Sequence, residues 1–127
     1  MKRHEAWLKQ AHSELRFGKL AADNQFYAQA CFIAQQAAEM ALKAIAFYRR
    51  AELVKAHSIK NIAQALGING KIEGYGRKLD MYYTSTRYPD ALPDNIVPAE
   101  FFTLEQAGEA LQMAEEILKI ADDEVQP

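Results

Sequence analysis

Apolar residues recur at helical spacing in several stretches of the chain, and nowhere do they alternate with polar residues over the length of a strand. In the first stretch, residues 4–22, the positions that share one helical face are Leu8, Ala11, Leu15, Gly18 and Ala22. A helix is therefore predicted over about residues 4–22, and the Asp23-Asn24 pair ends it.

The strongest helical pattern covers residues 26–48, where rows of alanine alternate with larger apolar residues. Because most of its circumference is apolar, this helix is predicted to be the central one. Its polar residues fall within an arc of roughly 120° and are Gln29, Gln35, Gln36, Glu39 and Lys43. We interpret that arc as the solvated stripe of a helix that does not cross a membrane, with Glu39 and Lys43 forming an i,i+4 pair.

Three further helices are predicted downstream. A short one follows His57 and Ser58 and ends before Gly67, which suits a left-handed cap. Another covers about residues 71–84, and the last begins with a Thr103–Gln106 capping box and continues to about residue 122. The heptad repeats and small residues indicate an all-α, up-and-down bundle of about five helices, forming one domain over residues 1–127.

Residues 85–102 have no helical period and contain three prolines, Pro89, Pro93 and Pro98. Long connections in compact domains are usually functional or disordered. The aromatic residues of this stretch, Tyr88, Phe101 and Phe102, favour an ordered Pro-rich loop pinned to the bundle.

Composition narrows the class of function. The chain has 127 residues, half of them hydrophobic, and a formal net charge of -2, so any site for nucleic acid has to be a local patch. The single cysteine, Cys31, lies in an apolar stretch and is expected to be a buried thiol in a cytoplasmic protein. No secretory signal is predicted from the charged N-terminus.

The residues that carry chemistry give few candidate sites. His4, His12 and His57 lack the spacing of a metal motif, so we interpret them as surface histidines and predict no metal site and no cofactor. Arg87, beside Tyr88, is suited to holding a phosphate or stacking on a base. The residues alone favour a structural role, in which Arg87 pairs with Asp90 or Asp80 and caps helix carbonyl groups.

Several blocks of the sequence, in this order, resemble the HEPN domain family. They are residues 34–44 (AQQAAEMALKA), 57–59 (HSI), and 79–83 (LDMYY) leading to 86–90 (TRYPD), with Trp7 in the first helix. The resemblance implies a helical bundle similar to the C-terminal domain of kanamycin nucleotidyltransferase, and a homodimer. It also implies an association with nucleotide binding and with a minimal nucleotidyltransferase partner, in a pair that behaves as toxin and antitoxin.

Some branches of that family are metal-independent ribonucleases that use an Arg followed, after four to six residues, by a His. Arg87 has no such histidine downstream, and the fifth residue after Arg77 is Tyr82. Only Arg50 and His57 match this spacing. In such an enzyme His57 would act as acid and base on a ribose 2′-hydroxyl, and Arg50 would stabilise the developing negative charge.

Three hypotheses follow from the sequence. The leading one is a binding module that presents Arg87, Tyr88, His57 and Lys43 to a nucleotide or RNA. The second is a ribonuclease toxin acting through Arg50 and His57. The third is a purely structural partner that docks a nucleotidyltransferase.

Overall fold

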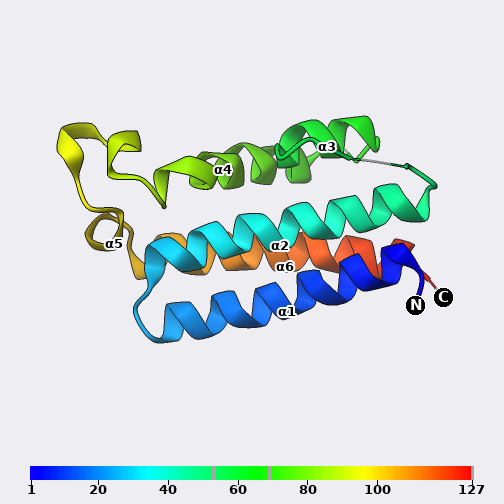
Figure 1. Ribbon diagram of the computed structural model, residues 1–127, viewed down its shortest axis with the longest axis horizontal. Coiled ribbons are helices and arrows are strands. Elements are labelled where there is room, and N and C mark those ends of the chain that lie inside the picture. The colour runs from blue at the N-terminus through cyan, green and yellow to red at the C-terminus, as the bar shows by residue number, and fades with distance from the viewer. Residues whose placement is uncertain (53, 69, 127) are drawn as a thin grey trace.

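The computed structural model describes residues 1–52, 54–68 and 70–126, and every regular element within them is helical (Figure 1). The elements are α1 (Arg3–Asp23), α2 (Tyr27–Tyr48), α3 (Ile59–Ala65), α4 (Lys71–Ser85), two 3-10 turns, η1 (Pro89–Ala91) and η2 (Pro93–Asn95), α5 (Pro98–Phe101) and α6 (Leu104–Glu124). The predicted all-α class is confirmed. The described residues form six α-helices rather than five because the Pro-rich segment contributes the four-residue α5.

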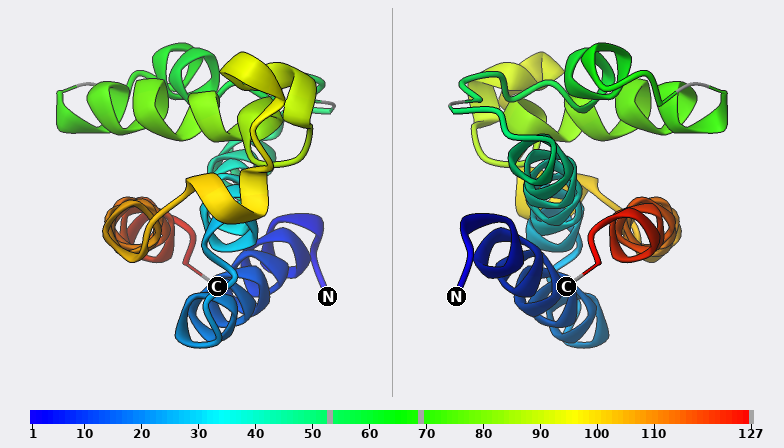
Figure 2. Two further views of the ribbon diagram at one scale, coloured as in Figure 1. Left: turned by 90° about the vertical axis from the view of Figure 1, so that its left-hand side faces the viewer. Right: turned by 90° about the vertical axis from the view of Figure 1, so that its right-hand side faces the viewer.

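The long helix α2 lies at the centre of the bundle, as predicted. Seen end-on, it is surrounded by α1, α6 and the α3–α4 pair, with α1 and the α3–α4 pair on opposite sides (Figure 2). The chain runs in alternating directions through α1, α2, α4 and α6, which is up-and-down topology (Figure 1). None of the helices among the described residues is long and apolar enough to span a bilayer.

Small residues allow the three longest helices to approach closely. Alanines on α2 and α6, including Ala34, Ala41 and Ala114, are completely buried. A Cβ atom added to Gly18 of α1 would lie 2.8 Å from a methyl carbon of Leu111 on α6. Gly18 therefore marks the place where α1 and α6 come together.

A second glycine explains how α4 packs on α3. A Cβ atom at Gly76 would lie 2.7 Å from the backbone nitrogen of Lys60. Glycine at position 76 lowers the helix propensity of α4, but its missing side chain allows the backbones of α4 and α3 to come into close contact.

Several local predictions are confirmed. Thr103 and Gln106 form the capping box of α6, Ser58 is the N-cap of α3, and Gly67 adopts a φ of 72° after it. Cys31 is fully buried, and this burial raises the pKa of its thiol to about 12, so the thiol is neutral at physiological pH.

The Pro-rich segment is ordered by short helical turns instead of an irregular loop. Pro89, Pro93 and Pro98 each begin one of them, a position at which the missing N–H group costs no helix bond. Phe102 anchors the segment in the core, 5.8 Å from the ring of Tyr82. Tyr88, in contrast, is 51% exposed and does not serve as an anchor.

Candidate functional site

The polar side of α2 is mostly buried, so the prediction of a solvated stripe is wrong for its central part. Gln35, Glu39 and Lys43 occupy successive turns and are 0%, 5% and 5% exposed. Trp7 of α1 and the segment that leads into α3 pack over them. A side of a helix with this many charges is buried only where the charges are paired.

These buried groups form one hydrogen-bonded network. Lys43 Nζ donates to Glu39 Oε2 at 3.0 Å, which confirms the predicted i,i+4 pair. The Nδ1 atom of His57 lies 3.4 Å from the same carboxylate oxygen. Gln35 Nε2 donates to the other Glu39 oxygen at 3.4 Å and to the backbone oxygen of His57 at 3.1 Å. Among the described residues, no buried side-chain nitrogen or oxygen lacks a partner.

His57 is the point where this network reaches solvent. Its side chain is 58% exposed, and its ring stacks on that of Tyr83 with centroids 5.4 Å apart. A carboxylate beside one ring nitrogen orients the imidazole and leaves the second nitrogen for a ligand. His57 is therefore held as a reactive or binding group would be.

Asp80 of α4 fixes the backbone that follows His57. Its carboxylate accepts hydrogen bonds from the backbone nitrogens of Ile59 at 2.6 Å and Lys60 at 3.3 Å, and from Ser58 Oγ at 2.8 Å. These groups belong to the start of α3, whose first N–H groups have no partner within the helix. Asp80 is thus committed to α3 and does not pair with Arg87 as the sequence allowed.

Arg87 lies just beyond the end of α4, and its guanidinium group rests on aromatic rings. Its central carbon is 4.5, 4.7 and 5.1 Å from the ring centroids of Phe32, Tyr83 and Tyr88. Nε donates to the backbone oxygen of Tyr83 at 2.8 Å, so the predicted capping of a helix carbonyl is confirmed. No carboxylate of the described residues forms an ion pair with Arg87, Asp90 included. We call Phe32, Tyr83, Arg87 and Tyr88 the arginine–aromatic cluster.

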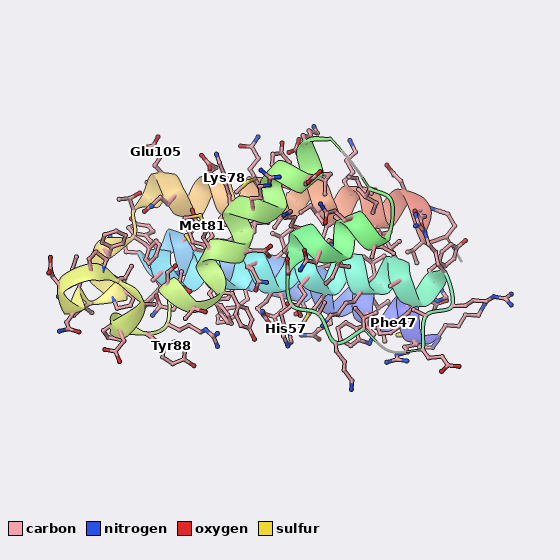
Figure 3. The ribbon with its side chains drawn as sticks, turned by 90° about the horizontal axis from the view of Figure 1, so that it is seen from above. Phe47, His57, Lys78, Met81, Tyr88 and Glu105 are labelled. Carbon is pink, nitrogen blue, oxygen red and sulfur yellow. The ribbon has the colours of Figure 1, made fainter. Side chains whose placement is uncertain are left out.

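The cluster and His57 are continuous through Tyr83, which contacts both. A pocket of about 190 Å³ opens between His57, Ser58, Asp80 and Tyr83. In Figure 3, His57 and Tyr88 lie along the same edge of the molecule, whereas Lys78 and Glu105 lie toward the opposite edge. Arg87, Tyr88 and His57 are therefore brought together at one surface, and Lys43 supports that surface from below.

Arg50, the other half of the ribonuclease-type spacing, lies elsewhere. It follows the end of α2 in a left-handed conformation, with a φ of 73°. His57 sits beside Glu39, which is about 14 Å back along α2 from Tyr48 at 1.5 Å per residue. Within the part of the chain that the structure describes, no hydrogen bond or ion pair joins Arg50 to His57.

A larger hollow, of about 630 Å³, lies between α1 and α6. Its charged walls pair with each other: His12 Nε2 lies 2.8 Å from Asp122, and Lys19 Nζ lies 3.4 Å from Glu115. We call this surface the α1–α6 groove. Arg16 and Lys119 also line it without an ion pair among the described residues, but neither rests on an aromatic ring there, so neither is held in place as Arg87 is.

Sequence reasoning missed Phe32, Tyr83 and Asp80 as members of the site. Tyr83 and Arg87 are four residues apart, which places them on one helical face and could have indicated their contact. Tyr82 packs against Phe102 instead, and burial raises the pKa of its hydroxyl to about 12. The contact of Phe32 with Arg87 joins residues 55 positions apart and has no local signal in the sequence.

Comparison with known proteins gives one family and two close structures. The HEPN domain model matches residues 4–124. The crystal structure of TT1696 from Thermus thermophilus is 36% identical, covers 98% of this chain and 100% of its own, and superposes with a TM-score of 0.91. The crystal structure of ST0689, an archaeal HEPN homologue, is 33% identical, covers 99% and 100%, and has a TM-score of 0.84. No curated protein matches the chain.

Proposed function

The chain belongs to the HEPN domain family, and from its arginine–aromatic cluster we propose that it is a nucleotide- or RNA-binding module. One observation carries the proposal: the Arg87 guanidinium is fixed on three rings yet has no carboxylate partner among the described residues. A cation held in place without a counter-charge is suited to a phosphate group, and the rings around it are suited to a base.

His57 and Lys43 have different parts in this proposal. The exposed imidazole of His57 borders the 190 Å³ pocket and contacts the ligand. The side chain of Lys43 is 6% exposed and donates a hydrogen bond to Glu39. Lys43 therefore acts indirectly, by positioning the carboxylate that orients His57. Tyr88, half exposed beside Arg87, supplies a face on which a base stacks.

Family membership supports the wider setting of the proposal. The protein acts as a homodimer and works with a minimal nucleotidyltransferase in a pair that resembles toxin and antitoxin. The first part is tested by light scattering of the purified protein, and the second by purification of the chain with a nucleotidyltransferase encoded beside it. If the protein is a monomer and no nucleotidyltransferase is purified with it, this setting is contradicted. The proposal of ligand binding does not depend on that outcome.

One observation favours a second candidate, a ribonuclease. The Glu39 carboxylate at 3.4 Å from His57 Nδ1 is the arrangement that orients a general acid or base. In this candidate the second His57 nitrogen acts on the ribose 2′-hydroxyl. No hydrogen bond or ion pair of the described residues joins Arg50 to His57, so the contacts of this chain identify no charge-stabilising group for this candidate.

Calorimetry and a cleavage assay separate the two candidates. A binding module takes up nucleoside triphosphates or a short RNA without cleaving it, and Arg87→Ala weakens the affinity about tenfold because a charged hydrogen-bonding group is lost. The matched control is Arg77→Ala, which removes an arginine of α4 that pairs with Glu73 and leaves the affinity unchanged. Cleavage of labelled RNA that His57→Ala abolishes would establish the ribonuclease instead. Unchanged affinity of Arg87→Ala, with a lower Tm, would make Arg87 structural and overturn the proposal.

A further inference from the structure

Arg3, near the N-terminus, is held in the same way as Arg87. Its NH1 group donates to the backbone oxygen of Glu52 at 2.7 Å, and its guanidinium carbon lies 3.8 Å from the ring centroid of Phe47. No carboxylate of the described residues forms an ion pair with it. One backbone carbonyl and at least one aromatic ring therefore fix each of these two guanidinium groups. Neither group has a carboxylate of the described residues to balance its positive charge.

The other four arginines are held differently. Arg16 and Arg50 have neither an ion pair nor a ring contact among the described residues, and the remaining two are paired. Arg49 is bound by both carboxylate oxygens of Glu124, and Arg77 pairs with Glu73. A ring and a carbonyl orient a guanidinium without neutralising it, whereas a carboxylate does both. Arg3 and Arg87 thus share a property that suits them to an anionic ligand.

The two arginines stand at opposite ends of one side of α2. Arg3 rests on Phe47 and Arg87 on Phe32, and these rings are fifteen residues apart on the helix, or about 22 Å at 1.5 Å per residue. Fifteen residues at about 100° each return to within roughly 60° of the same face. Figure 3 shows Phe47, His57 and Tyr88 in this order along one edge of the molecule.

Aromatic rings lie between the two ends; Phe47 is buried, Trp7, Phe32 and Tyr83 are half-buried, and His57 is exposed. The ring of Trp7 lies 5.3 Å from that of Phe47 and under the Lys43 ammonium group. Further along, His57 stacks on Tyr83, whose ring lies next to that of Phe32. We call this row, from Arg3 past His57 to Arg87, the α2 track.

We propose that the α2 track binds a single-stranded nucleic acid that contacts Arg3 and Arg87 at the same time; this rests on the proposed function and names its ligand. Proteins that bind single strands combine separated cations for the phosphates with exposed ring faces for unpaired bases. A stacked strand carries one phosphate per about 3.4 Å, so the track spans about six nucleotides, or fewer of an extended strand. A mononucleotide reaches only one end of it.

Binding of fluorescein-labelled uridine oligonucleotides of two and eight residues, followed by anisotropy, tests this proposal. The octamer is expected to bind more tightly than the dinucleotide. Arg3→Gln keeps a donor for the Glu52 carbonyl but removes the charge. It is expected to weaken octamer binding about tenfold, to lower the slope of log affinity against log salt by about 0.7, and to leave the dinucleotide unaffected. The matched control, Arg16→Gln, changes an exposed arginine of α1 that lines the α1–α6 groove and has no effect.

The outcomes distinguish the track from the site on which it rests. If both oligonucleotides bind equally and depend on Arg87 but not on Arg3, the track is wrong and the proposed function stands. If neither oligonucleotide binds, the track is wrong, and the proposed function fails with it unless nucleoside triphosphates bind. Equal weakening of both by Arg3→Gln, with a lowered Tm, would show a structural role for Arg3 and overturn the track. A thymidine deoxyoctamer measured in parallel shows whether the track binds RNA or DNA more tightly.

Discussion

On the side of the bundle where α1 faces α6, His12 meets Asp122 and Lys19 meets Glu115 across a hollow of about 630 Å³. On the side formed by α2, α4 and the segment before α3, a pocket of about 190 Å³ lies beside an arginine that rests on rings and meets no carboxylate of the described residues. Two ion pairs thus span the larger hollow, and its remaining cations, Arg16 and Lys119, rest on no ring of the described residues. The smaller pocket borders a guanidinium group that aromatic rings hold in place. We therefore take an oriented cation, more than the size of a hollow, as the mark of the candidate ligand site.

The two sides also differ in what lies beneath them. The ion pair between Lys43 and Glu39 has side chains 6% and 7% exposed, whereas those of Lys19 and Glu115 are 49% and 59% exposed. Removing one partner of a buried pair leaves an uncompensated charge away from water, while an exposed charge is simply hydrated.

The largest effect is therefore expected for Lys43→Met, which should lower the free energy of unfolding by about 3 kcal/mol. Its counterpart Lys19→Met should change it by less than about 0.5 kcal/mol. Urea denaturation of both variants measures the difference. The double variant Glu39→Leu, Lys43→Met should recover much of the free energy of unfolding that Lys43→Met loses, because neither charge of the pair then remains buried. Equal costs for the two lysines would show that the two sides do not differ as described.

A smaller effect is expected for the carboxylate that holds the start of α3. Asp80→Ala removes the acceptor of two backbone N–H groups and one hydroxyl and should cost about 2 kcal/mol. On the opposite side, Asp122→Ala removes only the exposed pair with His12 and should cost less than about 0.5 kcal/mol. Thermal unfolding followed by circular dichroism compares the two, and a larger cost for Asp122 would reverse the comparison.

The smallest effect is expected at the glycines. Gly76→Ala drives a methyl group into the backbone of Lys60 and should cost about 1 kcal/mol after the gain in helix propensity. Gly18→Ala, beneath the α1–α6 groove, meets the side chains of Leu111 and Ile33, which can shift, and should cost less. Gly74→Ala has no neighbour within 4 Å among the described residues and should stabilise α4 by up to about 1 kcal/mol. A stabilising Gly76→Ala would show that α3 and α4 are not packed this closely.

The helices could be predicted from the sequence because their signals are local. The heptad rows of α2 and α6, the Thr103–Gln106 box and the Ser58 cap each depend on residues within one or two turns. The short turns of the Pro-rich segment were missed because three or four residues are too few to show a helical period.

The site was predicted only in part, because its contacts join distant segments. Arg87, Tyr88 and His57 were identified by residue type and by resemblance, and they do share one surface. The stripe with Glu39 and Lys43 was assigned to solvent because periodicity cannot tell a wet face from one covered by another segment. The covering segment carries His57, eighteen residues from Glu39, and only the tertiary fold brings the two together.

The most direct test of where a ligand binds is a titration of the ¹⁵N-labelled protein with the uridine octamer, followed by backbone amide chemical shifts. We expect the shifts to concentrate at residues around Phe32, His57, Tyr83 and Arg87, while the amides of α1 and α6 that line the groove with His12 and Asp122 stay unchanged. Shifts concentrated along the α1–α6 groove, or no shifts at all, would contradict this prediction.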